Sequence, residues 1–405
     1  MKTKPFVAIR PAEGTVAKIA AVPYDVVDSR EAADLAAGNP LSFLHVSRPE
    51  IDLPPGTDIY SDAVYAQARK ALSGLVESGA MLRDAEASYF IYRQQMGGHV
   101  QTGVVACCHI DDYGDDVIRK HEKTRQDKED DRTRHVLETG ANTGPVFLTY
   151  RDVAAIDAVV DECSAASPLY DFVSDDGNRH SVWKVPARVT ATLRGLFDKV
   201  PVAYVADGHH RAKAAWRAGS ELRAAGAGPD AESNWFLAVL FPTSQLMILP
   251  YNRLVADLNG LSPDAFLSRC GEVFAVAQGA AKTPSAPRSV SMYLGGKWYS
   301  LAWPEFEGNP VSVLDVSVLQ ERLLAPVLGI ADPRTDSRIS FAGGIRGTGY
   351  LESEVDSGRA AVAFSMAPVT VGQMMSIADA GAIMPPKSTW FEPKLRSGLF
   401  VHEIR

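Results

Sequence analysis

Apolar and polar positions along the chain follow two periods, which predicts short strands interleaved with amphipathic helices. Residues 201–206 form a short apolar run of strand length. Asp207 and Gly208 follow as a turn and helix-cap dipeptide, and the residues from His209 to about position 225 continue as a helix. The pattern therefore predicts a strand, a tight turn and a helix centred on Gly208.

The same mixture of periods extends over the rest of the chain. Residues 58–79 carry an apolar stripe typical of a long helix, and residues 87–110 resemble a hairpin with Gly97 and Gly98 at its turn. Further strands are predicted at 6–9, 41–46, 146–150 and 235–241, and further helices at 314–324 and 371–380. Together these elements indicate an α+β fold.

A charged segment at 117–135 contains a second predicted helix start. Thr124 with Asp127 three residues later resembles a capping box, and Gly140 is a stop signal. His121 and Glu122 thus precede a helix start, where a carboxylate can act as a general base. The alternative is a charged surface helix, and for residues 127–130 that alternative is favoured. The acidic residues 111–116 lack calcium-loop spacing and are interpreted as a solvated connector.

Composition narrows the class of protein. The chain has 405 residues, 46% hydrophobic and 22% charged, which is typical of a globular protein with two or three lobes. Its net charge of −8 argues against general attraction to nucleic acid or an anionic membrane, although a local basic pocket can still hold phosphate. A signal core and a membrane-length apolar run are not apparent, so a cytoplasmic location is expected.

The four cysteines predict neither a disulfide framework nor zinc. Cys107, Cys108, Cys163 and Cys270 form no Cys-x-x-Cys pair and no Cys/His spacing for zinc. Cys107 and Cys108 are adjacent within an apolar strand, which favours buried, reduced thiols.

The turn after residue 206 concentrates candidate chemistry. His209, His210 and Arg211 occupy the first turn of a helix, where backbone N–H groups lack intrahelical partners. A glycine that allows close approach and an arginine beside it suit a phosphate group. The alternative is an ordinary capped helix with two solvated histidines.

Other polar residues are candidates for a site. Tyr24 and Asp25 lie in a turn after Pro23, where Asp25 alternatively caps the turn. Asn142 precedes a strand, and Arg253 could reach a phosphate or carboxylate, although an ordinary surface arginine is an equal alternative. Residues 384–394 contain prolines that fix an extended backbone around two lysines, which a Pro-rich surface segment would also explain.

Asp207-Gly208-His209-His210-Arg211 resembles the signature of the ParB/sulfiredoxin fold superfamily, in the version found in free serine kinases. The whole chain also resembles a large prokaryotic family known as domain of unknown function ten-fifteen. The matching stretches are residues 22–27, 121–124, 206–211 and 384–394.

The resemblance implies a ParB/sulfiredoxin-like nucleotide-binding core with mixed-sheet elaborations and a kinase acting on the hydroxyl of a small metabolite such as serine or a hydroxy acid. It implies ATP or ADP as cofactor with Mg²⁺, although the metal ligands stay unassigned. The nucleotide phosphates are expected at Asp207, Gly208, His209, His210, Arg211, Lys387 and Lys394. Glu122 is our candidate base, with His121 and His210 beside it as catalytic candidates. The substrate is expected near Tyr24, Asp25, Lys123, Thr124, Asn142 and Arg253.

Three alternatives share the turn. A partition-type, nucleotide-dependent DNA-binding or NTPase regulatory protein would need a helix-turn-helix module and a basic face, and the net acidity argues against it. Sulfiredoxin-like repair requires a cysteine where His209 stands. A non-catalytic nucleotide sensor would not need Glu122.

Two domains are expected. The core with its N-terminal elaboration would span 1–280, and a C-terminal α/β region whose tail returns to the active site would span 281–405, with residues 279–288 as the linker. The expected partners are a nucleotide and a small-molecule substrate, without nucleic acid or membrane. Homo-oligomerisation is left open.

Overall fold

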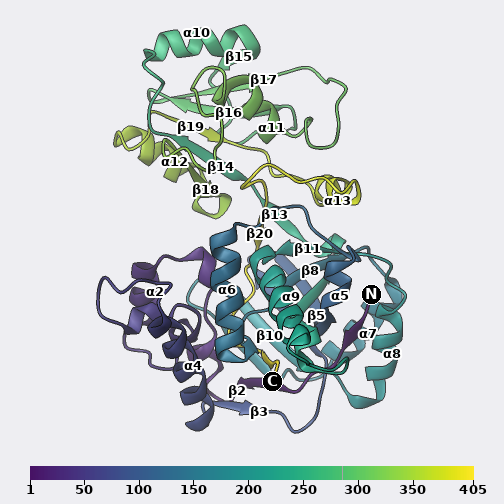
Figure 1. Cartoon of the computed structure of the whole chain (residues 1–405). Coiled ribbons are helices and arrows are strands. Elements are labelled where there is room, and N and C mark those ends of the chain that lie inside the picture. Colours follow the sequence, from purple (N-terminus) through teal and green to yellow (C-terminus); the bar gives the residue numbers. More distant parts are fainter. Residues whose placement is uncertain (285) are drawn as a thin grey trace. The chain divides into compact units, whose positions relative to one another are not determined.

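The computed structural model describes residues 1–284 and 286–405; position 285, inside the predicted linker, lies outside the described residues. The chain is a mixed α/β protein with several sheets (Figure 1). Its contacts divide it into two units. Unit 1 comprises residues 1–120, 124–246 and 393–405, and unit 2 comprises residues 121–123 and 247–392.

The main sheet of unit 1 has nine strands. They follow the order β6-β11-β8-β12-β5-β4-β10-β9, and β1 pairs with β5. Pairing is parallel in β6–β11 and β8–β12 and antiparallel elsewhere. The strands are β1 (Thr3–Lys4), β4 (Phe90–Met96), β5 (His99–His109), β6 (Ile118–Arg119), β8 (Val146–Tyr150), β9 (Tyr170–Val173), β10 (Arg179–Lys184), β11 (Ala203–Asp207) and β12 (Trp235–Pro242).

A smaller antiparallel sheet of unit 1 joins strands that are far apart in sequence. Its order is β3-β2-β21-β7, so β21 pairs with β2 and with β7. The strands are β2 (Ala8–Pro11), β3 (Met81–Arg83), β7 (Ala141–Asn142) and β21 (Val401–Glu403). Residues 393–405 are thus a structural part of unit 1.

Helices cover these sheets. The α-helices of unit 1 are α1 (Val16–Ile19), α2 (Ser29–Ala36), α3 (Leu44–Ser47), α4 (Asp62–Glu77), α5 (Ile110–Gly114), α6 (Gln126–Thr139), α7 (Ala154–Ser164), α8 (Ala187–Phe197) and α9 (His209–Ala224). Short 3₁₀ turns are η1 (Tyr24–Val26), η2 (Pro49–Asp52), η3 (Glu232–Asn234) and η4 (Thr243–Gln245). α6 and α9 lie side by side (Figure 1).

The core of unit 1 follows from strand alternation. Val104, Ala106 and Cys108, which point to one face of β5, share a buried cluster with Leu193 of α8 and Ala212 of α9. The residues of this cluster are at most 9% exposed, and removing apolar surface from water is the main favourable contribution to folding. The cluster therefore fixes α9 against the sheet and, with it, the turn at Gly208.

Unit 2 contains a six-stranded antiparallel sheet in the order β15-β17-β16-β19-β14-β18 and a two-stranded ladder of β13 with β20. The strands are β13 (Met247–Leu249), β14 (Tyr251–Val255), β15 (Ala275–Gln278), β16 (Ser289–Leu294), β17 (Lys297–Ala302), β18 (Ile339–Gly343), β19 (Val362–Ser365) and β20 (Trp390–Glu392). The helices are α10 (Pro263–Val273), α11 (Asp315–Leu319), the π-helical η5 (Gln320–Leu324), the 3₁₀ turn η6 (Gly344–Arg346), α12 (Gly347–Asp356) and α13 (Val371–Asp379). The expected domain boundary at 280 falls between β15 and β16, inside unit 2, and the proposed two-domain division stays a prediction.

Three local predictions are wrong. Residues 41–46 do not form a strand, since Leu44–Ser47 form the helix α3. A short apolar run does not by itself distinguish a helix from a strand. Thr124 does not cap α6; Arg125 holds the cap position, and the Thr124 hydroxyl donates to the Glu129 carboxylate instead. The acidic segment 111–116 is not a solvated connector throughout, since α5 includes its first residues and Asp112 is buried.

The four cysteines are buried free thiols, as predicted. Among the described residues, helices are all too short or too polar to cross a membrane.

Candidate functional site

The predicted strand, turn and helix around Gly208 are confirmed. β11 ends at Asp207, Gly208 adopts φ 91° and ψ 33°, and α9 begins at His209 without a side-chain cap. A Cβ atom at position 208 would lie 3.0 Å from Cζ and Nε of Arg211. Glycine is required here by its positive φ and by the close approach of the Arg211 guanidinium.

Asp207 is fixed at the end of β11 by cations. The register with β8 shifts between Val205 and Asp207, and Asp207 then pairs with Phe147 as the last residue of the strand. Its Oδ2 lies 3.2 Å from Lys394 Nζ and 3.8 Å from Arg211 Nη2, and its Oδ1 accepts a hydrogen bond of 3.0 Å from the Gly208 N–H. Burial alone would raise the pKa of the Asp207 carboxyl, but Lys394 and Arg211 outweigh burial and hold that pKa well below its usual range.

Arg211 keeps spare donors in this environment. Its side chain is only 11% exposed, its Nη1 donates to the Pro145 carbonyl, and its Nη2 lies 3.8 Å from Asp25 Oδ2. Its buried Nε has no hydrogen-bond partner in the described part of the chain. Burial would lower the Arg211 pKa, but Asp25 and Asp207 outweigh it and raise the pKa, so the group stays charged. A guanidinium offers five N–H donors, and the two carboxylates are too distant to use most of them.

The two histidines of the turn differ. Burial lowers the pKa of His209 to about 4, although Asp207 opposes this, so His209 is neutral near pH 7. The Nε2 of His210 accepts a hydrogen bond of 3.2 Å from the Arg125 backbone N–H, which requires an unprotonated nitrogen. His210 thereby joins the start of α9 to the start of α6.

A cavity of about 30 Å³ lies within unit 1 beside this turn. Its polar lining includes Tyr24, Arg132, His135, Asn142 and Arg211. The volume is enough for one or two water molecules or for the head group of a small ligand. Two arginines on the wall of one small cavity make it suitable for an oxyanion.

Arg132, Asp131 and His135 are polar residues of this site that the sequence analysis did not single out. The Arg132 guanidinium lies 4.3 Å from the Tyr24 ring centroid, and its Nε lies 2.8 Å from Asp131 Oδ2. Burial and Arg132 together lower the pKa of His135 to about 4, and its Nε2 is 2.9 Å from the Val46 carbonyl. The sequence feature that could have identified these residues is the four-residue spacing of Asp131 and His135, which places them on one face of a charged helix.

The remaining unit 1 candidates have structural partners. Asn142 is buried, and its Oδ1 accepts a hydrogen bond of 3.3 Å from the Leu237 N–H and lies 3.2 Å from His402 Nδ1. Asp127 and Asp130 are exposed on α6, as the surface alternative predicts, whereas Glu129 is buried and lies 3.3 Å from Arg217.

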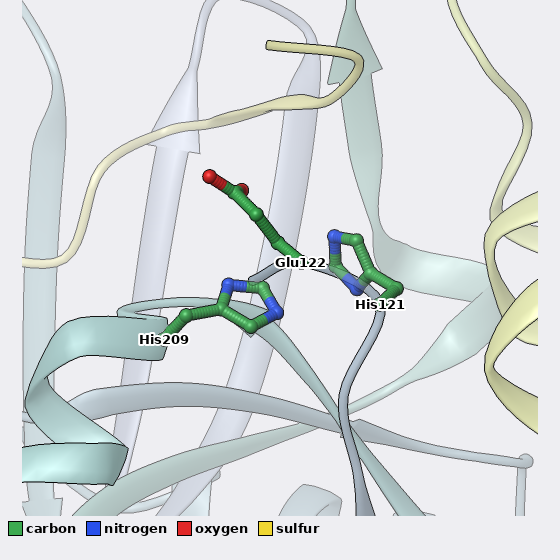
Figure 2. A group of neighbouring side chains, drawn as sticks. All are labelled: His121, Glu122 and His209. Carbon is green, nitrogen blue, oxygen red and sulfur yellow. The ribbon is translucent and has the colours of Figure 1, made fainter. Parts of the chain in front are cut away.

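His121, Glu122 and Lys123 belong to unit 2. Figure 2 shows His121 and Glu122 on a connecting segment and His209 at the start of a helix. Within unit 2, the His121 carbonyl accepts a hydrogen bond of 2.8 Å from the Met384 N–H, and its Nε2 lies 3.4 Å from Thr389 Oγ1. Residues 121–123 and residues 384–389, far apart in sequence, are therefore neighbours in this unit.

Arg253 and Lys387 are also neighbours in unit 2. Arg253 Nη2 donates to the Lys387 carbonyl at 3.2 Å, and the Lys387 Nζ lies 5.4 Å from the Tyr251 ring centroid. Lys387 has a positive φ of 56°, a conformation that is uncommon for a residue with a side chain. The two lysines of the proline-rich segment thus differ in location, because Lys387 lies in unit 2 and Lys394 in unit 1.

The fold and this turn define a mixed α/β protein whose unit 1 carries a cationic helix start. The family model described as "Protein of unknown function (DUF1015)" matches residues 3–317, so the chain belongs to that family.

Solved structures that resemble the chain do so distantly. A free serine kinase in complex with AMP is 12% identical, with a TM-score of 0.37, and the match covers 74% of this chain and 91% of the kinase. SbnI from Staphylococcus aureus, with a C-terminal truncation, is 12% identical with a TM-score of 0.40, and the match covers 74% and 87% of the two chains. A conserved hypothetical protein from Pyrococcus furiosus is 13% identical with a TM-score of 0.36, covering 74% and 95%. No curated protein matches the sequence.

Proposed function

We propose that this protein is a phosphotransferase that uses a nucleoside triphosphate or diphosphate to phosphorylate the hydroxyl of a small metabolite such as serine or a hydroxy acid. In this proposal unit 1 is a ParB/sulfiredoxin-like core, and the Asp207–Arg211 turn holds the nucleotide phosphates. The observation that carries the proposal is the pair of cations, Arg211 and Lys394, anchored on Asp207 at an uncapped helix start.

The electrostatics of the turn support phosphate binding. Asp207 Oδ2 lies 3.2 Å from Lys394 Nζ and 3.8 Å from Arg211 Nη2, so it orients both cations while leaving donors of Arg211 available for a phosphate. The start of α9 adds backbone N–H groups and the positive end of the helix dipole. Pre-oriented cations stabilise the charge that develops on a transferring phosphoryl group without reorganising during the reaction.

Catalytic roles are assigned by chemistry. Glu122 accepts the proton of the substrate hydroxyl while the new P–O bond forms and the P–O bond to the leaving nucleotide breaks. His121 and His210 are assigned to positioning the phosphoryl group, and Lys387 to neutralising charge beside the leaving oxygen. The residues assigned to the substrate are Tyr24, Asp25, Lys123, Thr124, Asn142 and Arg253.

Magnesium enters this proposal as part of the nucleotide complex. Proteins usually bind Mg²⁺ through one or two carboxylates together with the substrate phosphates, and those carboxylates must not already be paired with cations. Asp207 does not fit that requirement, since Lys394 contacts its Oδ2 and the Gly208 N–H donates to its Oδ1. No residue of the turn is therefore assigned as a metal ligand, and no step is routed through one.

The test is product formation across a panel of hydroxylated metabolites. The protein is incubated with ATP or ADP and with serine, threonine, glycerate, lactate or homoserine, and phosphorylated product is measured by mass spectrometry. We expect one member to give product together with stoichiometric ADP or AMP. Nucleotide binding is measured separately by calorimetry. Binding without any phosphorylated product would instead indicate a nucleotide sensor, and absence of binding would contradict both.

A further inference from the structure

Unit 2 contains a pocket whose lining includes Arg253 but no other residue assigned to the phosphotransfer. Its volume is about 270 Å³, near the lower end of the range for small-molecule sites. The wall is mostly apolar, with polar atoms from Arg253, Gln320, Asp332 and Arg334. The apolar part of the wall is formed by Val316, Leu324, Ala331, Pro333, Ile339, Phe341, Pro385 and Pro386.

The pocket is lined by a buried cation, Arg253. Arg253 is only 4% exposed, and among residues 1–284 and 286–405 no carboxylate forms an ion pair with it. Burial lowers the pKa of its guanidinium to about 10. Buried charges in proteins are ordinarily paired, because removing a charge from water without compensation is costly.

The contacts that Arg253 does make fix it in place. Nη1 donates to the Tyr251 carbonyl, Nη2 donates to the Lys387 carbonyl at 3.2 Å, and the guanidinium lies 5.5 Å from the Phe341 ring centroid. These neutral partners orient the guanidinium but do not neutralise it. The other charged groups of the pocket balance each other, since Arg334 Nε lies 3.2 Å from Asp332 Oδ1.

We propose that this pocket binds a small organic monocarboxylate with an apolar body, whose carboxylate pairs with Arg253. The apolar wall suits the body, and the uncompensated charge of Arg253 matches a single negative charge. A phosphate monoester carries close to two negative charges and would leave one unpaired. The pocket belongs to unit 2 and the turn at Gly208 to unit 1, and carboxylate binding at Arg253 does not depend on kinase activity.

The experiment uses the full chain and four probes. Butyrate, benzoate, the neutral isostere benzamide and phenyl phosphate are titrated by ligand-observed NMR. Arg253→Met removes the charge. Ala331→Phe fills the pocket from an exposed position on its wall and leaves the arginine in place. Arg269→Met, which removes an exposed arginine of α10, is the matched control.

We expect butyrate and benzoate to bind, and benzamide to bind at least about tenfold more weakly than benzoate, as for loss of a charged hydrogen bond. Both pocket variants should weaken carboxylate binding by a similar factor, and Arg269→Met should not. Circular dichroism checks folding; if Arg253→Met does not fold, Ala331→Phe decides. The proposal is overturned if neither carboxylate binds, if benzamide or phenyl phosphate binds as well as benzoate, or if Ala331→Phe leaves binding unchanged.

Discussion

Lys394 Nζ lies 3.2 Å from Asp207 Oδ2, across 187 residues of sequence. The pair connects the segment after β20 to the end of β11, inside unit 1. Since Asp207 also faces Arg211, the two cations of the turn share one carboxylate.

Replacing Lys394 by Met should lower stability and weaken nucleotide binding together. Asp207 would lose its nearer cation, and because both side chains are partly exposed, at 14% and 27%, we expect a loss of about 1–2 kcal/mol in the free energy of unfolding. Urea unfolding at pH 7 measures this loss, and calorimetry with ATP measures binding. Lys199→Met, at an exposed position after α8, is the control and should change neither. Unchanged stability would show that Arg211 alone suffices for Asp207.

Replacing Gly208 by Ala should cost roughly 1–3 kcal/mol of stability, because a side chain is strained at φ 91° and its Cβ would lie 3.0 Å from the guanidinium. The displaced Arg211 should also weaken ATP binding. The matched substitution Gly195→Ala lies within α8, where nothing is within 4 Å of the added Cβ, and it should stabilise by about 0.5–1 kcal/mol. If both substitutions have the same effect, the turn has no special geometric requirement.

His135 should make stability depend on pH. Its pKa is lowered from 6.5 to about 4 in the folded chain, so the unfolded chain binds the extra proton between these values. Its contribution is therefore complete above about pH 6.5 and is lost as the pH falls toward 4. His135→Gln should reduce the loss of stability between pH 7 and 4.5 by roughly 2–3 kcal/mol. Urea unfolding at both pH values measures this, and a ring-proton NMR titration with a midpoint near 6.5 would contradict it.

Replacing Glu122 by Gln should lower turnover by about 10²–10⁴-fold if this carboxylate is the base. Nucleotide affinity should stay the same, because the change removes proton transfer and no phosphate contact. The measurement compares kcat with the ATP dissociation constant, using the substrate found in the metabolite panel. Glu77→Gln, at an exposed position of α4, is the control. Full turnover in the Glu122 variant would assign the base elsewhere.

Local signals predicted the turn because all its determinants are close in sequence. The apolar run ends at Asp207, Gly208 supplies the left-handed backbone, and the helix follows at once. The resemblance led us to expect a role for Lys394, but its pairing with Asp207 depends on tertiary packing that no local period encodes. Asp131 and His135 were missed for a related reason: a run of charges predicts a solvated helix, and only the neighbouring elements decide which of its faces is buried. A similar ambiguity explains the wrong strand prediction at 41–46, because the four residues of α3 fit the helical period and the strand period equally well.

The place of residues 393–405 has a consequence for synthesis on the ribosome. These residues belong to unit 1 and supply β21, which pairs with β2 and β7, yet they follow the whole of residues 247–392 in the chain. At ordinary rates of translation, roughly 150 intervening residues take about 10–30 s to emerge. During that interval the edges of β2 and β7 that pair with β21 are unpaired, and Asp207 lacks its ion-pair partner Lys394. A chaperone that shields exposed strand edges would act on this nascent chain within that interval.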